Sequence, residues 1–271
     1  MEIITNFLMQ IVFSVGVIVI FGLLIALCRK AFCNISGEKG TKILLITGII
    51  GTPIHELSHA LMCLIFGHKI TEIKLYQPNN DDNTLGYVKH SYNPKNLYQQ
   101  IGNFFIGIAP ILGGSAVISL LMFICTPSLF TEVIDELQFM ELISFDLLDI
   151  STYEAIFGLF WDVFSEIFDF TNMGNPLWWL FIILAIMIAS HMELSVADIK
   201  GGLKGFIFIT IIFLIADIIM YFVSIEVLER VTSIMASFAT SIIGFLAISI
   251  VFLVVMVLIA LSVKGLLKIK R

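Results

Sequence analysis

The sequence predicts an all-α polytopic membrane protein of about six transmembrane helices with a small β-hairpin. Hydrophobic residues make up 59% of the chain and charged residues only 13%, whereas a soluble domain carries about 25% charged residues. The mean hydropathy is +1.02. Several apolar stretches reach about 20 residues, the length that crosses a bilayer as a helix. The whole chain, 1–271, is therefore expected to form a single integral membrane domain whose surroundings are the lipid bilayer.

The expected spans follow the apolar runs. The first is interpreted as a retained span because it lacks a basic leader and a small-residue cleavage site. Glycines and a proline lie in the second span before its polar cluster, where they can loosen the helix or simply allow close packing. The six predicted spans are 7–28, 43–66, 101–125, 177–197, 206–225 and 234–263.

A polar segment between the second and third spans predicts the β-hairpin. Residues 69–76 alternate between polar and apolar side chains, and a Pro-Asn-Asn-Asp-Asp-Asn turn follows. Alternation with period two is typical of a half-buried strand, and such turn residues separate paired strands. We therefore expect strands at 70–76 and 85–91.

The segment 126–176 contains ten acidic residues and no Lys or Arg. Its Phe, Leu and Ile residues are interleaved with the acids, which predicts short amphipathic helices on an extracytoplasmic membrane surface. Counting Lys and Arg around six spans favours both termini in the cytoplasm, and the basic tail is typical of a bacterial plasma membrane protein. The basic connection 29–42 then falls outside, and an atypical or re-entrant start of the second span would account for it.

Charge and cysteine content exclude other classes. The net charge is −6 without a basic stripe, so nucleic-acid binding is not expected. The four cysteines form no Cys-x-x-Cys pair. Neither a disulfide framework nor a cysteine zinc site is therefore predicted.

The second span contains the motif His55-Glu56-Leu57-Ser58-His59. On a helix, His55 and His59 share one face, so both imidazoles can bind one zinc ion, while Glu56 lies about 100° round the helix and can act on a water there. A charged side chain at the bilayer centre costs about 2.5–3.5 kcal/mol on insertion scales, which makes such a cluster a functional hypothesis. The alternatives are a chance match and a buried histidine pair without metal.

A catalytic zinc site needs three protein ligands and one open position. The chain offers four candidates for the third ligand at the ends of, or within, later spans: His191, Glu193, Asp198 and Asp217. In the expected orientation, His59 lies about one and a half turns from the cytoplasmic end of its helix. Asp198 lies near the inner end of its own span, so the two polar clusters can meet at similar depth.

These features resemble the site-2 protease family of intramembrane zinc metalloproteases. The resemblance covers about 43–202 and rests on the motif, the adjacent hairpin, and Asp198 followed by Gly201 and Gly202. It implies that His55, His59 and Asp198 bind zinc, that Glu56 is the general base, and that the substrate is the transmembrane helix of a membrane protein. The chain departs from the family pattern, which has Asn and Pro ahead of Leu-Asp-Gly, and would be a divergent member.

Two further residues are candidates for supporting roles. His191 is expected either to stabilise an oxyanion in place of the family's Asn or to be a hydrogen-bonded interior histidine. Asn103 is a candidate for supporting the ligands or contacting substrate. The free edge of the hairpin can bind an extended substrate segment by strand addition, and a purely structural hairpin is the alternative.

Two other functions compete with the protease. A transporter would pass a divalent metal through the same His and Asp cluster, although no inverted repeat is visible. A non-catalytic membrane scaffold would bind no zinc. Replacing Glu56 by Gln distinguishes the protease from the transporter, since it should remove hydrolysis and leave metal binding nearly unchanged.

Overall fold

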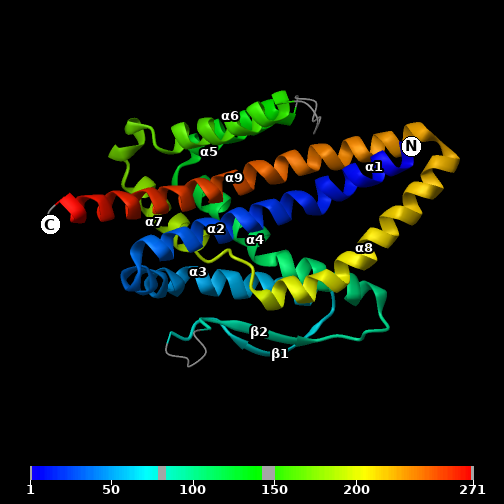
Figure 1. Ribbon diagram of the computed structural model, residues 1–271, viewed down its shortest axis with the longest axis horizontal. Helices are drawn as coiled ribbons and strands as arrows, with labels where there is room; N and C mark the ends of the chain where they lie inside the picture. Colours follow the sequence, from blue (N-terminus) through cyan, green and yellow to red (C-terminus); the bar gives the residue numbers. More distant parts are fainter. Residues whose placement is uncertain (1, 79–83, 142–149, 270–271) are drawn as a thin grey trace.

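The computed structural model describes residues 2–78, 84–141 and 150–269. Nearly all of this chain is helical, and the two strands form one antiparallel hairpin (Figure 1). The elements in order are α1 (Glu2–Ile11), a π-helical segment (Val12–Gly16), α2 (Val17–Ser36), α3 (Glu38–Ile65), β1 (Lys69–Lys74), β2 (Tyr87–Ser91), α4 (Leu97–Cys125), α5 (Pro127–Glu141), α6 (Ile150–Ile167), a 3-10 helix (Phe170–Gly174), α7 (Pro176–Ala189), α8 (Val196–Val223) and α9 (Ile225–Ile269).

Five helices of the described chain are long and apolar enough to cross a membrane. The predicted fold class, an all-α polytopic membrane protein with a small hairpin, is confirmed. The acidic segment contains helices as expected, α5 and α6, and residues 142–149 of it lie outside the described chain. The five segments are Ile3–Ser36, Glu38–Ile65, Leu97–Cys125, Val196–Val223 and Ile225–Leu266.

The fourth predicted span differs from the expectation. Residues 177–197 were expected to form one transmembrane helix, but α7 has only 14 residues and ends at Ala189. The polar residues that follow do not continue the helix, and α8 begins at Val196 behind a capping box formed by Ser195 and Asp198. A capping box fixes a new helix start, because the side chain of each partner accepts a hydrogen bond from the backbone N–H of the other. The predicted span is thus divided between two helices.

The first two long helices are joined by a single residue. Residues 3–36 form one continuous helical segment that includes the π-helical turn. Gly37 has a φ of 57° and connects Ser36 directly to Glu38. Glycine adopts this left-handed conformation without the steric cost that a Cβ would impose. The connection therefore turns the chain back sharply, and α3 returns along α2.

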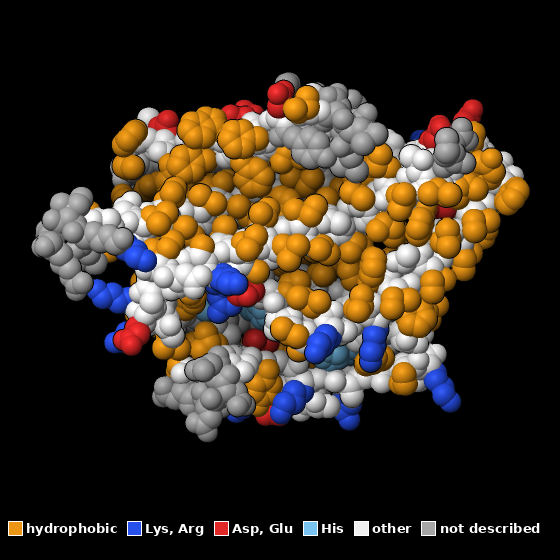
Figure 2. Space-filling view, viewed as in Figure 1, with side chains coloured by type: hydrophobic (Ala, Val, Ile, Leu, Met, Phe, Trp, Pro, Cys, Tyr) orange, Lys and Arg blue, Asp and Glu red, His pale blue; other side chains and the backbone are white. Residues whose placement is uncertain are grey.

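Helix α4 lies at the centre of the bundle. It packs against α3, α7, α8 and α9, and fifteen of its residues are buried. Helices α5 and α6 pack against each other and cover one side of α9 (Figure 1). The surface between the charged margins is largely apolar (Figure 2), with exposed residues such as Leu23, Ile211 and Phe222. Such an apolar surface suits contact with lipid tails.

The two ends of the described chain lie at opposite ends of the bundle. The start of α1 lies beside the junction of α8 and α9, whereas the end of α9 lies near the turn between α2 and α3 (Figure 1). The hydrogen bonds from Gln10 Nε2 to Asp217 Oδ1 (2.9 Å) and to Thr232 Oγ1 (3.1 Å) hold α1 at that junction. The short α7 accounts for this arrangement, since six full spans would return both ends to one side.

The hairpin runs beside α3 and is paired as predicted, with slightly shorter strands. Ile73 pairs with Val88 and Lys74 with Tyr87. On its exposed face, Lys89 Nζ lies 2.9 Å from a carboxylate oxygen of Glu72. Hydrogen bonds from Tyr87 and Lys89 lower the pKa of Glu72. These contacts tie the two strands together next to the end of α3.

Candidate metal centre

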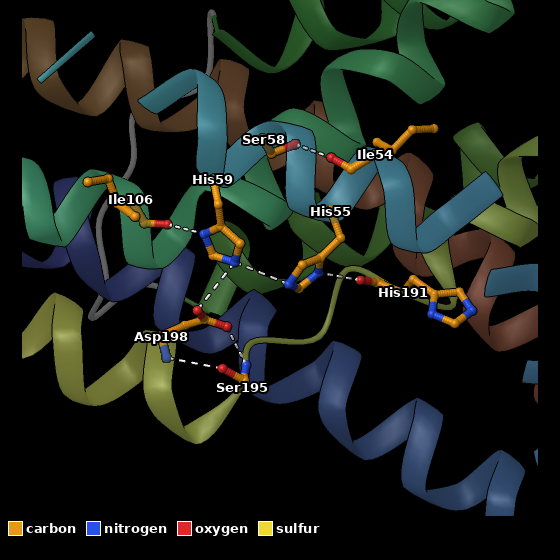
Figure 3. A network of polar contacts seen from close by, with 8 residues as sticks. All are labelled: Ile54, His55, Ser58, His59, Ile106, His191, Ser195 and Asp198. Atoms are coloured by element: carbon orange, nitrogen blue, oxygen red, sulfur yellow. Dashed lines mark hydrogen bonds and ion pairs between the residues drawn. The ribbon is translucent and has the colours of Figure 1, made fainter. Parts of the chain in front are cut away.

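The two motif histidines are oriented by backbone carbonyl groups. Nδ1 of His55 lies 2.7 Å from the carbonyl oxygen of His191, and Nδ1 of His59 lies 2.7 Å from that of Ile106 (Figure 3). A carbonyl oxygen only accepts, so each Nδ1 carries the proton and donates it. In the neutral rings, both Nε2 atoms are then unprotonated. A carbonyl that holds Nδ1–H in this way is the usual support of a metal-binding histidine.

The unprotonated Nε2 atoms of His55 and His59 face each other at 3.2 Å. Two lone pairs at this separation repel each other unless a proton or a cation lies between them. The rings meet edge to face, with centroids 4.9 Å apart. This arrangement, one helical turn apart on α3, is suited to a shared cation.

Asp198 completes the group from the first turn of α8. Its Oδ2 accepts a hydrogen bond from the backbone N–H of Ser195 (2.7 Å), and Ser195 Oγ accepts one from the backbone N–H of Asp198 (3.1 Å). The other carboxylate oxygen, Oδ1, lies 3.3 Å from His59 Nε2 (Figure 3). The capping box of α8 therefore directs one oxygen of Asp198 at the histidine pair.

These distances fit a tetrahedral metal ion. With metal–ligand bonds of about 2.0–2.2 Å, two ligand atoms of a tetrahedral zinc site lie about 3.3–3.5 Å apart. One donor atom from each of His55, His59 and Asp198 lies within 4.8 Å of the other two, and the two separations given above are 3.2 and 3.3 Å. Two imidazoles and a carboxylate are a donor set that zinc accepts. The residues present thus fit a zinc ion with one open position.

Comparison of the chain with protein-family models, with curated proteins and with solved structures finds no match. The site is therefore interpreted from its own geometry.

A pocket of about 610 Å³ opens onto this cluster. Glu56 lies in its wall next to the histidines and is only 5% exposed. The hairpin segment also lines the pocket, through Gly86, Tyr87 and Val88. A Cβ added to Gly86 would lie 2.8 Å from Cγ of Glu56, so the hairpin backbone passes directly over this carboxyl group. The pocket is therefore lined by the three candidate ligands, the carboxyl group of Glu56 and part of a strand.

His191 contributes to this region through both its backbone and its side chain. Its backbone carbonyl supports His55, whereas its imidazole lies 3.0 Å from Thr47 Oγ1 and 3.4 Å from Thr52 Oγ1, and is buried. Burial lowers the pKa of His191 to about 4, and the neighbouring Arg29 acts in the same direction. The ring is thus buried and hydrogen-bonded, and His191 and residues 193–198 line the pocket.

The remaining candidates lie in other surroundings. Asn103 is buried, and its side-chain amide donates to the carbonyl oxygens of Gln99 (3.4 Å) and Gln100 (3.3 Å) in its own helix. Glu193 forms an ion pair with Arg29 at the rim of the pocket. Asp217 is fully buried and accepts a hydrogen bond from Gln10, at the junction of α1, α8 and α9. Of the four candidates for the third ligand, Asp198 is the one grouped with both motif histidines.

Sequence reasoning missed the residues that position the cluster. The sequence Ser195-x-x-Asp198 has the spacing of a capping box and offered a signal for the start of α8. The carbonyls of Ile106 and His191 offered none, because every residue carries a carbonyl group and only the packing of α3 against α4 and α7 selects these two.

Proposed function

We propose that this protein is an intramembrane zinc metalloprotease that hydrolyses peptide bonds of membrane-embedded protein substrates. The observation that carries the proposal is the convergence of two unprotonated Nε2 atoms and one carboxylate oxygen, which line one pocket together with Glu56. The resemblance to site-2 proteases is in agreement with this function. An apolar exterior and five long apolar helices suit an enzyme that works within the bilayer.

Each residue has a defined task in this proposal. Zinc, when bound, supplies a Lewis acid that polarises the scissile carbonyl and makes water a nucleophile at neutral pH. His55, His59 and Asp198 would hold it. Glu56 takes the proton of the attacking water and delivers it to the leaving amine, as a general base and then a general acid. The new C–O bond forms first, and the C–N bond then breaks as the leaving amine takes the proton from Glu56.

The hairpin gives the substrate a place to bind. A helical substrate hides its carbonyl groups in hydrogen bonds, so a segment must unwind before it can be cleaved. The backbone of residues 86–88 lines the pocket beside Glu56. An unwound segment added to the sheet here would have its backbone groups hydrogen-bonded again, as in strand addition elsewhere.

The test combines zinc content with hydrolysis in detergent-purified protein. The substrate is a synthetic single-span peptide with an Asn-Pro pair in its apolar segment, which weakens the helix. We expect Glu56→Gln to keep its zinc and to lose hydrolysis by about 10²–10⁴-fold. Asp198→Ala should lose zinc from this cluster and hydrolysis together. The matched control, Glu193→Gln, should retain both.

Three outcomes would contradict the proposal. If the wild-type protein contained no zinc, the scaffold function would remain. If Glu56→Gln hydrolysed the peptide as fast as the wild type, Glu56 would not be the general base. The transporter would be indicated instead by two results together. The wild type would not hydrolyse the peptide, and zinc would enter sealed vesicles at the same rate with the wild type and with Glu56→Gln.

A further inference from the structure

A second group of metal-ligating side chains lies where α3 ends and the hairpin begins. Cys63 is in the last turns of α3, His68 is in the connection to β1, and His90 is in β2. One donor atom from each lies within 4.8 Å of the other two. Cys63 is fully buried, His68 is 4% exposed and His90 is half-buried. None of these three residues has a role in the proposed hydrolysis.

The protonation of His68 follows from its neighbours. Its Nε2 lies 2.7 Å from the carbonyl oxygen of Gln99, so Nε2 carries the proton and donates it. In the neutral ring, Nδ1 therefore presents a lone pair, and it faces His90 Nδ1 at 2.9 Å. The ring of His68 is also stacked on Tyr92, with centroids 5.0 Å apart. His68 thus has the backbone support and fixed orientation of a metal ligand.

We propose that Cys63, His68 and His90 bind a second zinc ion that fixes the hairpin to the end of α3. One thiolate and two imidazoles form a donor set typical of zinc. The fourth ligand would be a water, since His90 lines the pocket. Tetrahedral zinc requires about 3.3 Å between two imidazole nitrogens, so the His68–His90 distance of 2.9 Å needs to open only slightly. The cation also offsets the cost of a buried thiolate, since a coordinating thiol loses its proton.

The position of the ion gives it a consequence for the pocket. Cys63 follows His59 by four residues, so His55, His59 and Cys63 lie along one face of α3. His90 and the residues 84–88 line the pocket that holds Glu56. An ion that joins Cys63 to His90 therefore links the catalytic helix directly to the strand over the active site. Without it, the side-chain contacts that remain at this junction include the His68–His90 hydrogen bond and the hydrogen bond from Tyr76 to the carbonyl oxygen of Leu45 in α3.

The experiment counts metal ions and detects the thiolate. Full-length protein is purified with zinc for elemental analysis, and with Co²⁺ in its place for absorption spectroscopy. Wild type should contain about two metal ions per chain and show the near-ultraviolet charge-transfer band of a Co²⁺–thiolate bond. Cys63→Ser should contain about one and lose the band. The matched control Cys125→Ser, which removes another buried thiol, should resemble the wild type.

Two further variants keep the outcome decisive. His90→Asn leaves α3 intact and should also lose one metal ion and the band, even if Cys63→Ser fails to fold. Asp198→Ala should lose the other ion and keep the band, which separates this proposal from the proposed function. The second site would be overturned if the wild type contained one metal ion and showed no thiolate band, and if His90→Asn contained the same amount of metal. His68 and His90 would then be a hydrogen-bonded pair.

Discussion

At the scale of single residues, the proposed metal centre depends on side chains that do not touch the ion. Ser195 illustrates this, because its backbone N–H binds Asp198 Oδ2 and its hydroxyl accepts the N–H of Asp198. The carboxylate is thereby turned so that only Oδ1 faces His59. We expect Ser195→Ala to lower zinc affinity about 10–100-fold, the usual effect of removing a group that orients a ligand. Competition with a zinc-binding dye measures this change.

A cap without a metal ligand provides the control for Ser195. Asn175 caps α7 by accepting the N–H of Leu177 at 3.0 Å. Asn175→Ala and Ser195→Ala should each cost about 1 kcal/mol of stability, typical of a lost helix cap. Only the second should change zinc affinity. If both variants bind zinc as the wild type does, Ser195 is a cap alone and the orientation of Asp198 has another cause.

At the scale of elements, the close approach of α4 and α8 brings Asp198 to the histidines. A Cβ added to Gly107 of α4 would lie 2.6 Å from the carbonyl oxygen of Asp198 and 3.1 Å from Cα of Gly202. Both are backbone atoms, which cannot rotate away. Gly107→Ala should therefore push the start of α8 outward, cost about 1–3 kcal/mol through overpacking, and weaken zinc binding, as thermal unfolding and zinc titration would show.

Gly201, in the facing helix α8, provides the matched control. A Cβ there meets no atom within 4 Å, so Gly201→Ala should gain about 0.5–1 kcal/mol from the higher helix propensity of alanine. The two variants make the same chemical change in a helix, but Gly107→Ala should lower the stability of the protein and Gly201→Ala should raise it. Stabilisation of both would mean that α4 and α8 are not held at this distance.

The hairpin carries a prediction of its own. Lys74 pairs with Tyr87 next to the pocket-lining residues, and proline there removes an N–H and restricts φ. Lys74→Pro should impair hydrolysis of the single-span peptide far more than zinc binding by His55, His59 and Asp198. Lys74→Ala keeps the N–H and should remain close to the wild type. Equal loss of hydrolysis and of all bound zinc would discard the role of the hairpin in substrate binding.

The contrast between predictable and unpredictable features has a physical origin. The pairing of His55 with His59 follows from the helical period, and the hairpin follows from alternation around a turn, because both depend on local spacing. The shortness of α7 was missed because the mainly apolar run 177–197 predicts a single span, although polar residues follow Ala189 and the Ser195–Asp198 capping box starts another helix. The group of Cys63, His68 and His90 was missed because its members meet only after the chain reverses at Gly67, whose φ is 67°.

At the scale of the whole molecule, the charges are unevenly distributed between the ends of the bundle. Lys and Arg follow the lower and left margins of the face in Figure 2, and acidic side chains occur mainly along its upper margin. Four basic residues flank the α2–α3 turn and two more lie in the last part of α9, at the same end of the bundle: Arg29, Lys30, Lys39, Lys42, Lys264 and Lys268. The sequence then continues with Lys270 and Arg271. The opposite end, where α1 begins and α8 meets α9, has Arg230 with Glu226 and Glu229.

This distribution predicts that the termini lie on opposite sides of the membrane. Basic residues next to spans remain in the cytoplasm, so the end of α9 and the α2–α3 turn should be cytoplasmic and the start of α1 outside. This removes the conflict that six spans created, in which the basic connection 29–42 fell outside. Protease added to spheroplasts should remove an N-terminal epitope tag and leave a C-terminal tag intact. Protection of both tags would restore the six-span arrangement, and α7 would then have to cross with its 14 residues, about 21 Å of helix in a hydrocarbon layer of about 30 Å.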